Sequence, residues 1–159
     1  MTALVNYQNK RVVVRGCFSG MGEATARMLL RLGAEVHGLD YKDSSLALSS
    51  FTRVDLRDPL SIDTAAKKIG GRVDALFNCA GLPQTFPPLE VMKVNYAGTR
   101  FLTECMLPLM QSGSAIVNVA STAGRRRSTM DDGRWTIWKI TRSCSSSRAS
   151  IPWSTARRS

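Results

Sequence analysis

The sequence predicts an α/β protein built on a doubly wound parallel sheet that is incomplete at its carboxyl-terminal side. Short strand-like and helix-like patterns alternate through the first 124 of the 159 residues. Near the amino terminus, three consecutive valines run directly into a glycine-rich loop and a helix-forming stretch. The alternation stops after Gly124, and no sixth strand–helix unit follows.

The first unit comprises a strand predicted over residues 11–14 and a helix predicted over 21–32. The strand contains the three valines, whose β-branched side chains suit a buried strand. The helical stretch is rich in Glu, Ala, Met and Leu, and Gly33 ends it.

The next elements follow at short intervals. A second strand is predicted over 33–40, and a serine-rich polar linker separates it from a third strand over 52–56. A helix is predicted over 59–69. It begins with a proline, whose fixed φ suits a first helical turn, and a Gly-Gly pair ends it.

The last predicted elements are a strand over 73–81, a helix over 89–110 and a strand over 114–121. A glycine turn ends the first of these strands, and a loop with three prolines leads into the helix. Pro108 is expected to end or kink that helix.

The net charge of +10 is concentrated after Gly124. Residues 125–159 hold nine Lys and Arg against two acids, together with eight serines and all three tryptophans. We therefore predict a folded domain over 1–124 and a basic, poorly ordered tail over 125–159. A truncation or a shifted reading frame would produce such an abrupt change of composition.

Cysteine and histidine usage gives no indication of a metal site. The four cysteines lie far apart without C-x-x-C spacing, and His37 is the one histidine. No apolar run is long enough for a signal peptide or a membrane-spanning helix. Reduced thiols in a cytoplasmic protein without a membrane association are therefore expected.

The loop after the first strand indicates a phosphate-binding site. Gly16, Gly20 and Gly22 let backbone N–H groups approach a pyrophosphate, and Ser19 and Met21 complete the turn into the helix. A strand, a glycine loop and a helix in this order predict a Rossmann-type domain that binds a dinucleotide.

Asp40 closes the second predicted strand and indicates which dinucleotide is bound. A carboxylate there can accept hydrogen bonds from ribose hydroxyls and repels a 2′-phosphate, so NAD is favoured over NADP. Arg15 weakens this preference, because its cation could tolerate a phosphate. A solvated turn aspartate is the alternative role for Asp40.

These motifs, taken in order, resemble the short-chain dehydrogenase/reductase family over residues 8–124. The loop fits that family's G-x-x-x-G-x-G motif, Val54-Asp-Leu resembles its adenine-contacting segment, and Asn78-Cys-Ala-Gly resembles its N-N-A-G turn. The resemblance implies that the cofactor-binding residues are Gly16, Ser19, Gly20, Met21, Gly22, Asp40, Asp55, Leu56, Asn78, Ala80 and Gly81.

The same resemblance implies two catalytic positions. Asn95 corresponds to the family's asparagine in a water-linked proton path, and Ser121 to the strand-end serine that holds the substrate oxygen. The short spacing from Asn78 to Asn95 is similar to the subgroup containing 3α-hydroxysteroid and coniferyl-alcohol dehydrogenases. Structural roles remain open for all three: a strand-end asparagine, a mid-helix polar residue and a strand-terminating serine.

The family's Tyr-x-x-x-Lys pair is not found in this sequence. Lysine does not stand four residues after any of the tyrosines, which are Tyr7, Tyr41 and Tyr96. Trp135 and Lys139 have the spacing, but an indole N–H does not titrate usefully. The sequence therefore lacks the phenol that exchanges a proton with the substrate oxygen.

Three functions follow from these observations. The first is an NAD-linked oxidoreductase of small-molecule alcohols or ketones, and the second is a catalytically inactive nucleotide-binding remnant. The third is nucleic-acid binding through the basic tail, for which a merely solvated tail is the simpler alternative. The open sheet edge after the fifth strand also suggests a homo-oligomer.

Overall fold

The computed structural model describes residues 6–120 and confirms the predicted fold class. Within this range one parallel sheet has the strand order β3-β2-β1-β4-β5. Its strands are β1 (Arg11–Arg15), β2 (Glu35–Asp40), β3 (Ser50–Arg53), β4 (Val73–Asn78) and β5 (Met110–Asn118).

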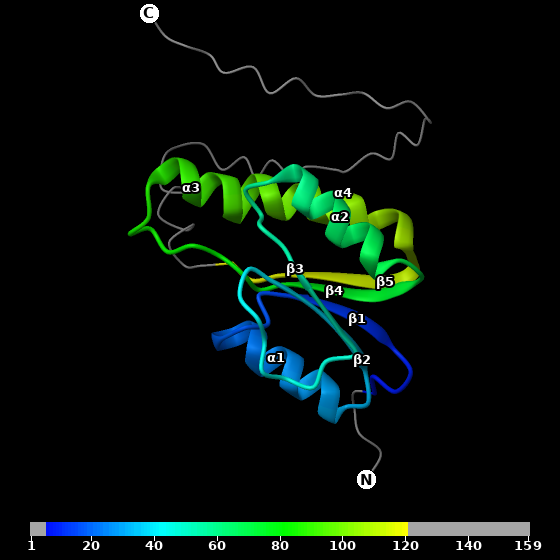
Figure 1. The fold of residues 1–159 in the computed structure, drawn as a ribbon. Helices are drawn as coiled ribbons and strands as arrows, with labels where there is room; N and C mark the ends of the chain where they lie inside the picture. Colours follow the sequence, from blue (N-terminus) through cyan, green and yellow to red (C-terminus); the bar gives the residue numbers. More distant parts are fainter. Residues whose placement is uncertain (1–5, 121–159) are drawn as a thin grey trace, which may run out of the picture. The chain divides into compact units, whose positions relative to one another are not determined.

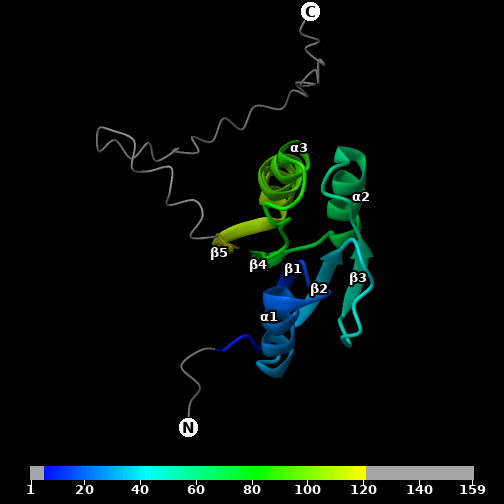
Figure 2. The same ribbon diagram turned by 90° about the vertical axis from the view of Figure 1, so that its left-hand side faces the viewer.

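Helices cover both faces of this sheet (Figures 1 and 2). One face carries α1 (Gly20–Arg31). The other face carries α2 (Pro59–Ile69) and a helical run that consists of α3 (Pro88–Met92), the π-helical η1 (Lys93–Gly98), α4 (Thr99–Met106) and the 3₁₀ turn η2 (Leu107–Leu109).

The alternation of side chains along β1 divides the core into two layers. Val13 packs with Leu39 and Leu76 in the layer under α2 and α4. Val12 and Val14 pack in the layer under α1. All three valines are fully buried, which explains why a short β-branched run forms the central strand of a doubly wound sheet.

The helix predicted over 59–69 is confirmed at both ends. Asp58 caps α2 by accepting a hydrogen bond from Leu60 N, and Pro59 occupies the first turn. Gly70 follows with a φ of +48° and ends the helix.

Strand bounds differ from the sequence prediction where tertiary pairing decides them. β3 begins at Ser50, because it pairs with β2 from His37↔Ser50 onward, and it ends at Arg53. β5 begins at Met110, inside the predicted helix, because the chain turns after Pro108 and Met110 pairs with Val73.

The helix predicted over 89–110 is a single helical run in space, but it is not regular. Its middle widens into the π-helical η1 over Lys93–Gly98 before α4 continues. Nothing in the local sequence pattern predicts this change of hydrogen bonding.

No helix connects β2 to β3, as the sequence predicts. The polar linker instead sends Leu46 and Leu48 against the core layer under α1. At the opposite edge of the sheet, Ile116, Val117 and Val119 are exposed, and among residues 6–120 no further strand pairs with β5. In the same range, no helix combines the length and apolar character needed to cross a membrane.

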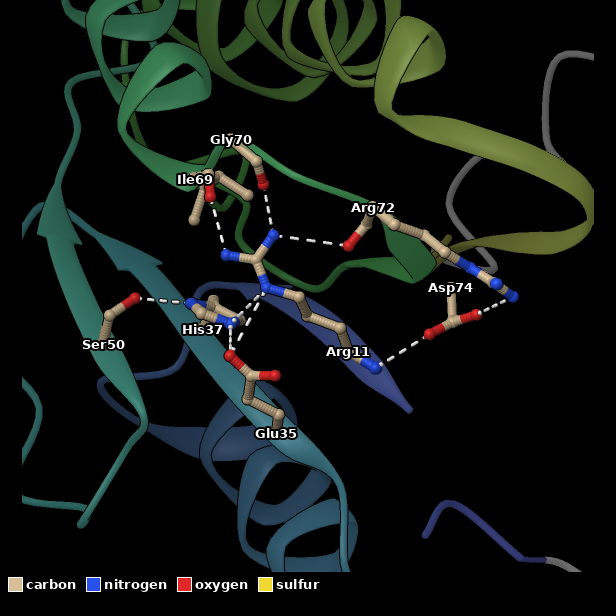
Figure 3. Close-up of polar contacts among 8 residues, drawn as sticks. All are labelled: Arg11, Glu35, His37, Ser50, Ile69, Gly70, Arg72 and Asp74. Atoms are coloured by element: carbon tan, nitrogen blue, oxygen red, sulfur yellow. Dashed lines mark hydrogen bonds and ion pairs between the residues drawn. The ribbon is translucent and has the colours of Figure 1, made fainter. Parts of the chain in front are cut away.

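A polar cluster ties the amino ends of the strands together, at the edge away from the glycine loop (Figure 3). The Arg11 guanidinium donates to carbonyls at the end of α2, including Ile69 O at 2.7 Å, and its Nε donates to His37 Nε2 at 2.9 Å. His37 Nδ1 lies 2.6 Å from Ser50 Oγ, and Glu35 Oε1 lies 2.8 Å from His37 Nε2.

This cluster makes stability depend on pH through His37. Burial lowers the pKa of His37 from its usual 6.5. A hydrogen bond that the protonated ring donates to Glu35 opposes that shift, and the Arg11 cation adds to it. Below pH 6.5 the unfolded chain therefore binds a proton that the folded chain resists. We expect the free energy of unfolding to fall as the pH is lowered from 7 to 5.

Urea unfolding at a series of pH values measures this effect, with the variant His37→Gln as comparison. The variant should flatten the slope between pH 6.5 and 5. Asp55 and Asp74, whose pKa values are lowered in the fold, lose their stabilising contribution below about pH 5, outside this window. An equal slope in both proteins would contradict the prediction.

Candidate functional site

The candidate site lies at the carboxyl ends of β1 and β4. The crossovers change direction there, since β2 and β3 lie on one side of β1 while β4 and β5 lie on the other. In open α/β sheets, ligands bind at such a switch point. The loops after β1, β2, β3 and β4 meet at this edge, and they carry the residues that the sequence singled out.

Two glycines let the glycine loop pack backbone to backbone. Gly16 has a φ of +92°, and a Cβ on it would lie 2.5 Å from Ala80 N in the turn after β4. A Cβ on Gly22, in the first turn of α1, would overlap the carbonyl oxygen of Gly16. These two glycines therefore serve the close packing of the loop, α1 and the β4 turn.

Gly20 differs because it faces open space. Its φ is +60°, and a Cβ on it would meet no atom within 4 Å. Ser19 precedes α1 in an extended conformation, and its side chain makes no capping hydrogen bond. The first N–H groups of α1 thus have no acceptor within the helix, and Met21 beside them is 64% exposed.

An open glycine beside unsatisfied helix N–H groups fits a diphosphate. The N–H groups supply donors, and the helix dipole supplies partial positive charge. Because α1 has 12 residues, its dipole places this partial positive charge at the first turn. The loop therefore fits the phosphates of a dinucleotide.

Asp40 lies against this loop, on the α1 side of the sheet. Its Oδ2 accepts a hydrogen bond from Phe18 N at 2.9 Å, and its Oδ1 accepts one from Lys42 N at 3.0 Å. Each carboxylate oxygen has a second lone pair, so both keep capacity to accept from ribose hydroxyls. The carboxylate is thus fixed in orientation by the loop that it borders.

The structure corrects the expected role of Arg15. Its side chain is on the same face as Val13, opposite to Asp40, and is only 2% exposed. The guanidinium donates to Thr99 Oγ1 at 2.9 Å and to Ala80 O. It is not placed to accept a 2′-phosphate beside Asp40, because both of its terminal nitrogens are bonded on the opposite face of the sheet.

Asn78 ends β4 with its side chain inside the protein. It is 2% exposed, and its Nδ2 donates to Asn118 Oδ1 at 2.8 Å and to Thr103 Oγ1 at 3.3 Å. These contacts join β4 to β5 and α4, which favours the strand-end structural role that the sequence left open. Ala80 and Gly81 follow in the turn, where Ala80 N donates to Arg15 O.

Asp55 and Leu56 lie on the loop after β3 and have separate surroundings. Asp55 forms a bidentate ion pair with Arg57, which lowers the pKa of its carboxyl group. Leu56 is buried, and a Cβ on Gly98 of η1 would overlap its carbonyl oxygen. This close approach brings the loop against the π-helical segment.

Asn95, in η1, reaches across to the turn after β4. Its Oδ1 accepts from Leu82 N at 2.7 Å, and its Nδ2 donates to Leu82 O at 2.9 Å. Asn95 therefore does not satisfy the backbone of its own helix, which was the structural alternative. It fixes the turn that follows Gly81, and its side chain lies at the edge of the candidate site.

Ser121 and the residues after it lie outside the described residues, as do the predicted basic tail 125–159 and Trp135 and Lys139. The structure therefore brings the glycine loop, Asp40, Asp55, Leu56, the Asn78–Gly81 turn and Asn95 to one edge of the sheet. It does not test the placement of Ser121 or the boundary predicted at residue 124.

The thiols near the site are not poised for reaction. Burial raises the pKa of Cys17 to about 11 and also raises that of Cys79 in the β4 turn. Both are therefore thiols at neutral pH rather than nucleophilic thiolates. In the part of the chain that the structure describes, no group of three His, Cys, Asp or Glu is arranged to hold a metal ion.

Sequence reasoning missed Thr99 and the true partners of Arg15. Thr99 Oγ1 donates to Val94 O at 3.1 Å and accepts from Arg15, which links the π-helical segment to β1. An arginine at the end of a buried strand was a signal that could have been used, because such a cation needs partners. The partners themselves are 65 and 84 residues away.

An all-parallel sheet of this order, with a glycine loop at its switch point, defines a Rossmann-type domain. The family model described as short chain dehydrogenase matches residues 10–131. The chain belongs to the short-chain dehydrogenase/reductase family.

Two curated relatives support this membership. A coniferyl-alcohol dehydrogenase from a Pseudomonas species is 45% identical over 116 residues, which cover 73% of this chain and 46% of the relative. A 3-alpha-hydroxysteroid dehydrogenase/carbonyl reductase from Comamonas testosteroni is 34% identical over 115 residues, which cover 70% of this chain and 44% of the relative. The chain thus spans about half the length of these relatives.

Solved structures share the fold. A short chain dehydrogenase from Shigella flexneri complexed with NADP has a TM-score of 0.66 at 23% identity, covering 76% of this chain and 63% of that one. An NADH-dependent reductase complexed with NAD has a TM-score of 0.65 at 21% identity, covering 76% and 62%. At these identities the likeness concerns the fold alone.

Proposed function

We propose that this chain binds NAD(H) in the manner of a short-chain dehydrogenase/reductase and forms the cofactor-binding part of an alcohol or ketone oxidoreductase. The open Gly20 beside the unsatisfied first turn of α1 carries this proposal. Asp40, held by Phe18 N at the end of β2, supports NAD rather than NADP. Family relatives named for aromatic-alcohol and hydroxysteroid oxidation support the substrate class.

Six residues of the site have a direct role in this proposal. The N–H groups of Met21 and Gly22 bind the diphosphate, and Asp40 accepts from the adenosine ribose. Leu56 and Gly81 border the cofactor, and Asn95 holds the turn beside it. The bound nicotinamide would supply the hydride chemistry.

Proton transfer is the step that these residues do not supply. The 159 residues contain no Tyr-x-x-x-Lys pair, so a phenol with a lysine to lower its pKa is missing from them. We therefore propose cofactor binding without turnover by this chain alone, and turnover as the second candidate function, with Ser121 and Asn95 in their expected places.

Titration with NADH tests both functions. The purified chain is titrated with NADH and with ADP-ribose while fluorescence and heat are followed, and is then assayed with NAD and aromatic or steroid alcohols. Binding without turnover supports the proposal, and turnover selects the second candidate. Absence of saturable NADH binding would refute both.

Asp40→Ser tests the choice between NAD and NADP. Because the variant loses the carboxylate that accepts from the ribose and repels a 2′-phosphate, we expect NADH affinity to fall about tenfold, equivalent to ~1.4 kcal/mol. The affinity for NADPH should rise relative to NADH. Calorimetric titration with both cofactors measures the ratio.

Asp43→Ser is the matched control. It removes the same charge three residues away, where Asp43 is exposed and pairs with Arg53. Both affinities should stay within twofold of the unmodified chain. An unchanged cofactor preference in Asp40→Ser would show that Asp40 does not contact the ribose.

A further inference from the structure

The guanidinium of Arg15 is a buried cation. Among residues 6–120, no carboxylate lies within ion-pair distance of it, and its Nε makes no hydrogen bond. Burial lowers the pKa of Arg15 to about 10, which reflects the cost of removing the charge from water. Burying this charge at the edge of the candidate site costs free energy, which indicates that Arg15 does more than fill the core.

The contacts of Arg15 converge on the turn after β4. Its backbone carbonyl accepts from Cys79 N at 2.9 Å and from Ala80 N at 3.0 Å. Its Nη2 donates to Ala80 O. Main chain and side chain of one residue thus hold both polar backbone groups of Ala80.

The other nitrogen of the same guanidinium reaches the π-helical segment. Nη1 donates to Thr99 Oγ1 at 2.9 Å, and that hydroxyl donates in turn to Val94 O at 3.1 Å. Asn95, the next residue, bonds both backbone groups of Leu82. The β4 turn and η1 are therefore tied at two points, by Arg15 through Thr99 and by Asn95.

We propose that Arg15 is a positioning residue, whose planar guanidinium spans Ala80 and Thr99 and thereby holds Asn95 in register with Leu82. A guanidinium suits this bridge because its donors lie in a fixed plane and point to two acceptors at once. A lysine at this position keeps the charge and loses the fork. An effect of this bridge on cofactor binding rests on the function proposed above, whereas the existence of the bridge does not.

Hydrogen exchange of the Leu82 amide tests the bridge without any cofactor. Leu82 N donates to Asn95 Oδ1, so its protection reports on the register of η1 and the turn. In Arg15→Lys we expect the protection factor of this amide to fall about tenfold relative to that of the Val13 amide in β1, which measures the stability of the core. A fall shared equally by Leu82 and Val13 would indicate a merely structural role and overturn the proposal.

Thr99→Val removes the same bridge from its other end. It therefore tests the proposal even if the Arg15→Lys protein does not fold. It should lower Leu82 protection to a similar extent, and the double variant should add little, because both changes break one bridge. Additive effects of the two changes would contradict the proposal. Arg11→Lys is the matched control at the other end of β1, and it should leave the ratio of Leu82 to Val13 protection unchanged.

NADH titration of the same variants separates the two proposals. If the unmodified chain binds NADH, Arg15→Lys should weaken binding about fivefold or more, and Arg11→Lys should not. If the unmodified chain does not bind NADH, the proposed function fails while the exchange result still decides the bridge. Full NADH affinity together with unchanged Leu82 protection in Arg15→Lys would overturn the positioning role.

Discussion

Gly22→Ala is expected to destabilise the fold by about 3 kcal/mol, at the upper end of the range for overpacked sites. The new methyl group would overlap the carbonyl oxygen of Gly16, which is backbone and cannot rotate away. Cys79 Cβ also lies 3.1 Å from the same point, so the new methyl group would be crowded by a second neighbour. Urea unfolding of the two proteins at neutral pH measures the difference.

Ala24→Ser is the control for this change. It adds one heavy atom to the same turn of α1 at an exposed position and should alter the free energy of unfolding by less than about 0.5 kcal/mol. If Gly22→Ala were as stable as the control, the glycine loop would not pack against α1 as described. NADH binding by a stable Gly22→Ala protein would lead to the same conclusion.

Gly20→Ala is expected to remove most of the NADH affinity while leaving the protein folded. The new methyl group meets open space, so the variant loses stability only because alanine disfavours the positive φ. This loss is about 1 kcal/mol in the free energy of unfolding. The methyl group would occupy the space above the first turn of α1, where the diphosphate is proposed to bind. The dissociation constant of NADH should rise at least about tenfold, equivalent to ~1.4 kcal/mol.

Gly113→Ala is the matched control, because it also adds a methyl group in open space at a glycine with a positive φ. Gly113 has a φ of +87° and no atom within 4 Å of an added Cβ, but it lies in β5, away from the glycine loop. It should lose a similar amount of stability and retain full NADH affinity. Equal NADH affinity in Gly20→Ala and Gly113→Ala would show that the glycine loop does not hold the diphosphate.

Most of the fold could be predicted because local residue patterns indicate its strands and helices. The three valines of β1 predict a buried strand, and Asp58, Pro59 and Gly70 set both ends of α2. The predicted first and last residues of strands were wrong where pairing with a neighbouring strand decides them. Met110 belongs to β5 because it pairs with Val73, and no pattern around Met110 contains that information.

The candidate site was predictable in its residues and less so in their roles. Gly20 follows β1 and Asp40 ends β2, so both lie at the edge where the carboxyl ends of the strands meet. Asn78 and Arg15 are also the last residues of strands, yet their side chains point into the layer under α4, where they bond Thr103 and Thr99. Which face a strand-end side chain takes depends on the pleat and on what covers that face.

The sequence by itself determined the order of strands and helices, the glycine loop and the carboxylate at the end of β2. These are properties of short stretches, in which residue type and spacing act through local conformation. Only the tertiary structure decided that Arg15 bridges Ala80 to Thr99, and that η1 turns Asn95 toward Leu82. Those contacts join residues 13 to 84 positions apart, and they form because the packing of η1 and α4 on the sheet brings these donors and acceptors together.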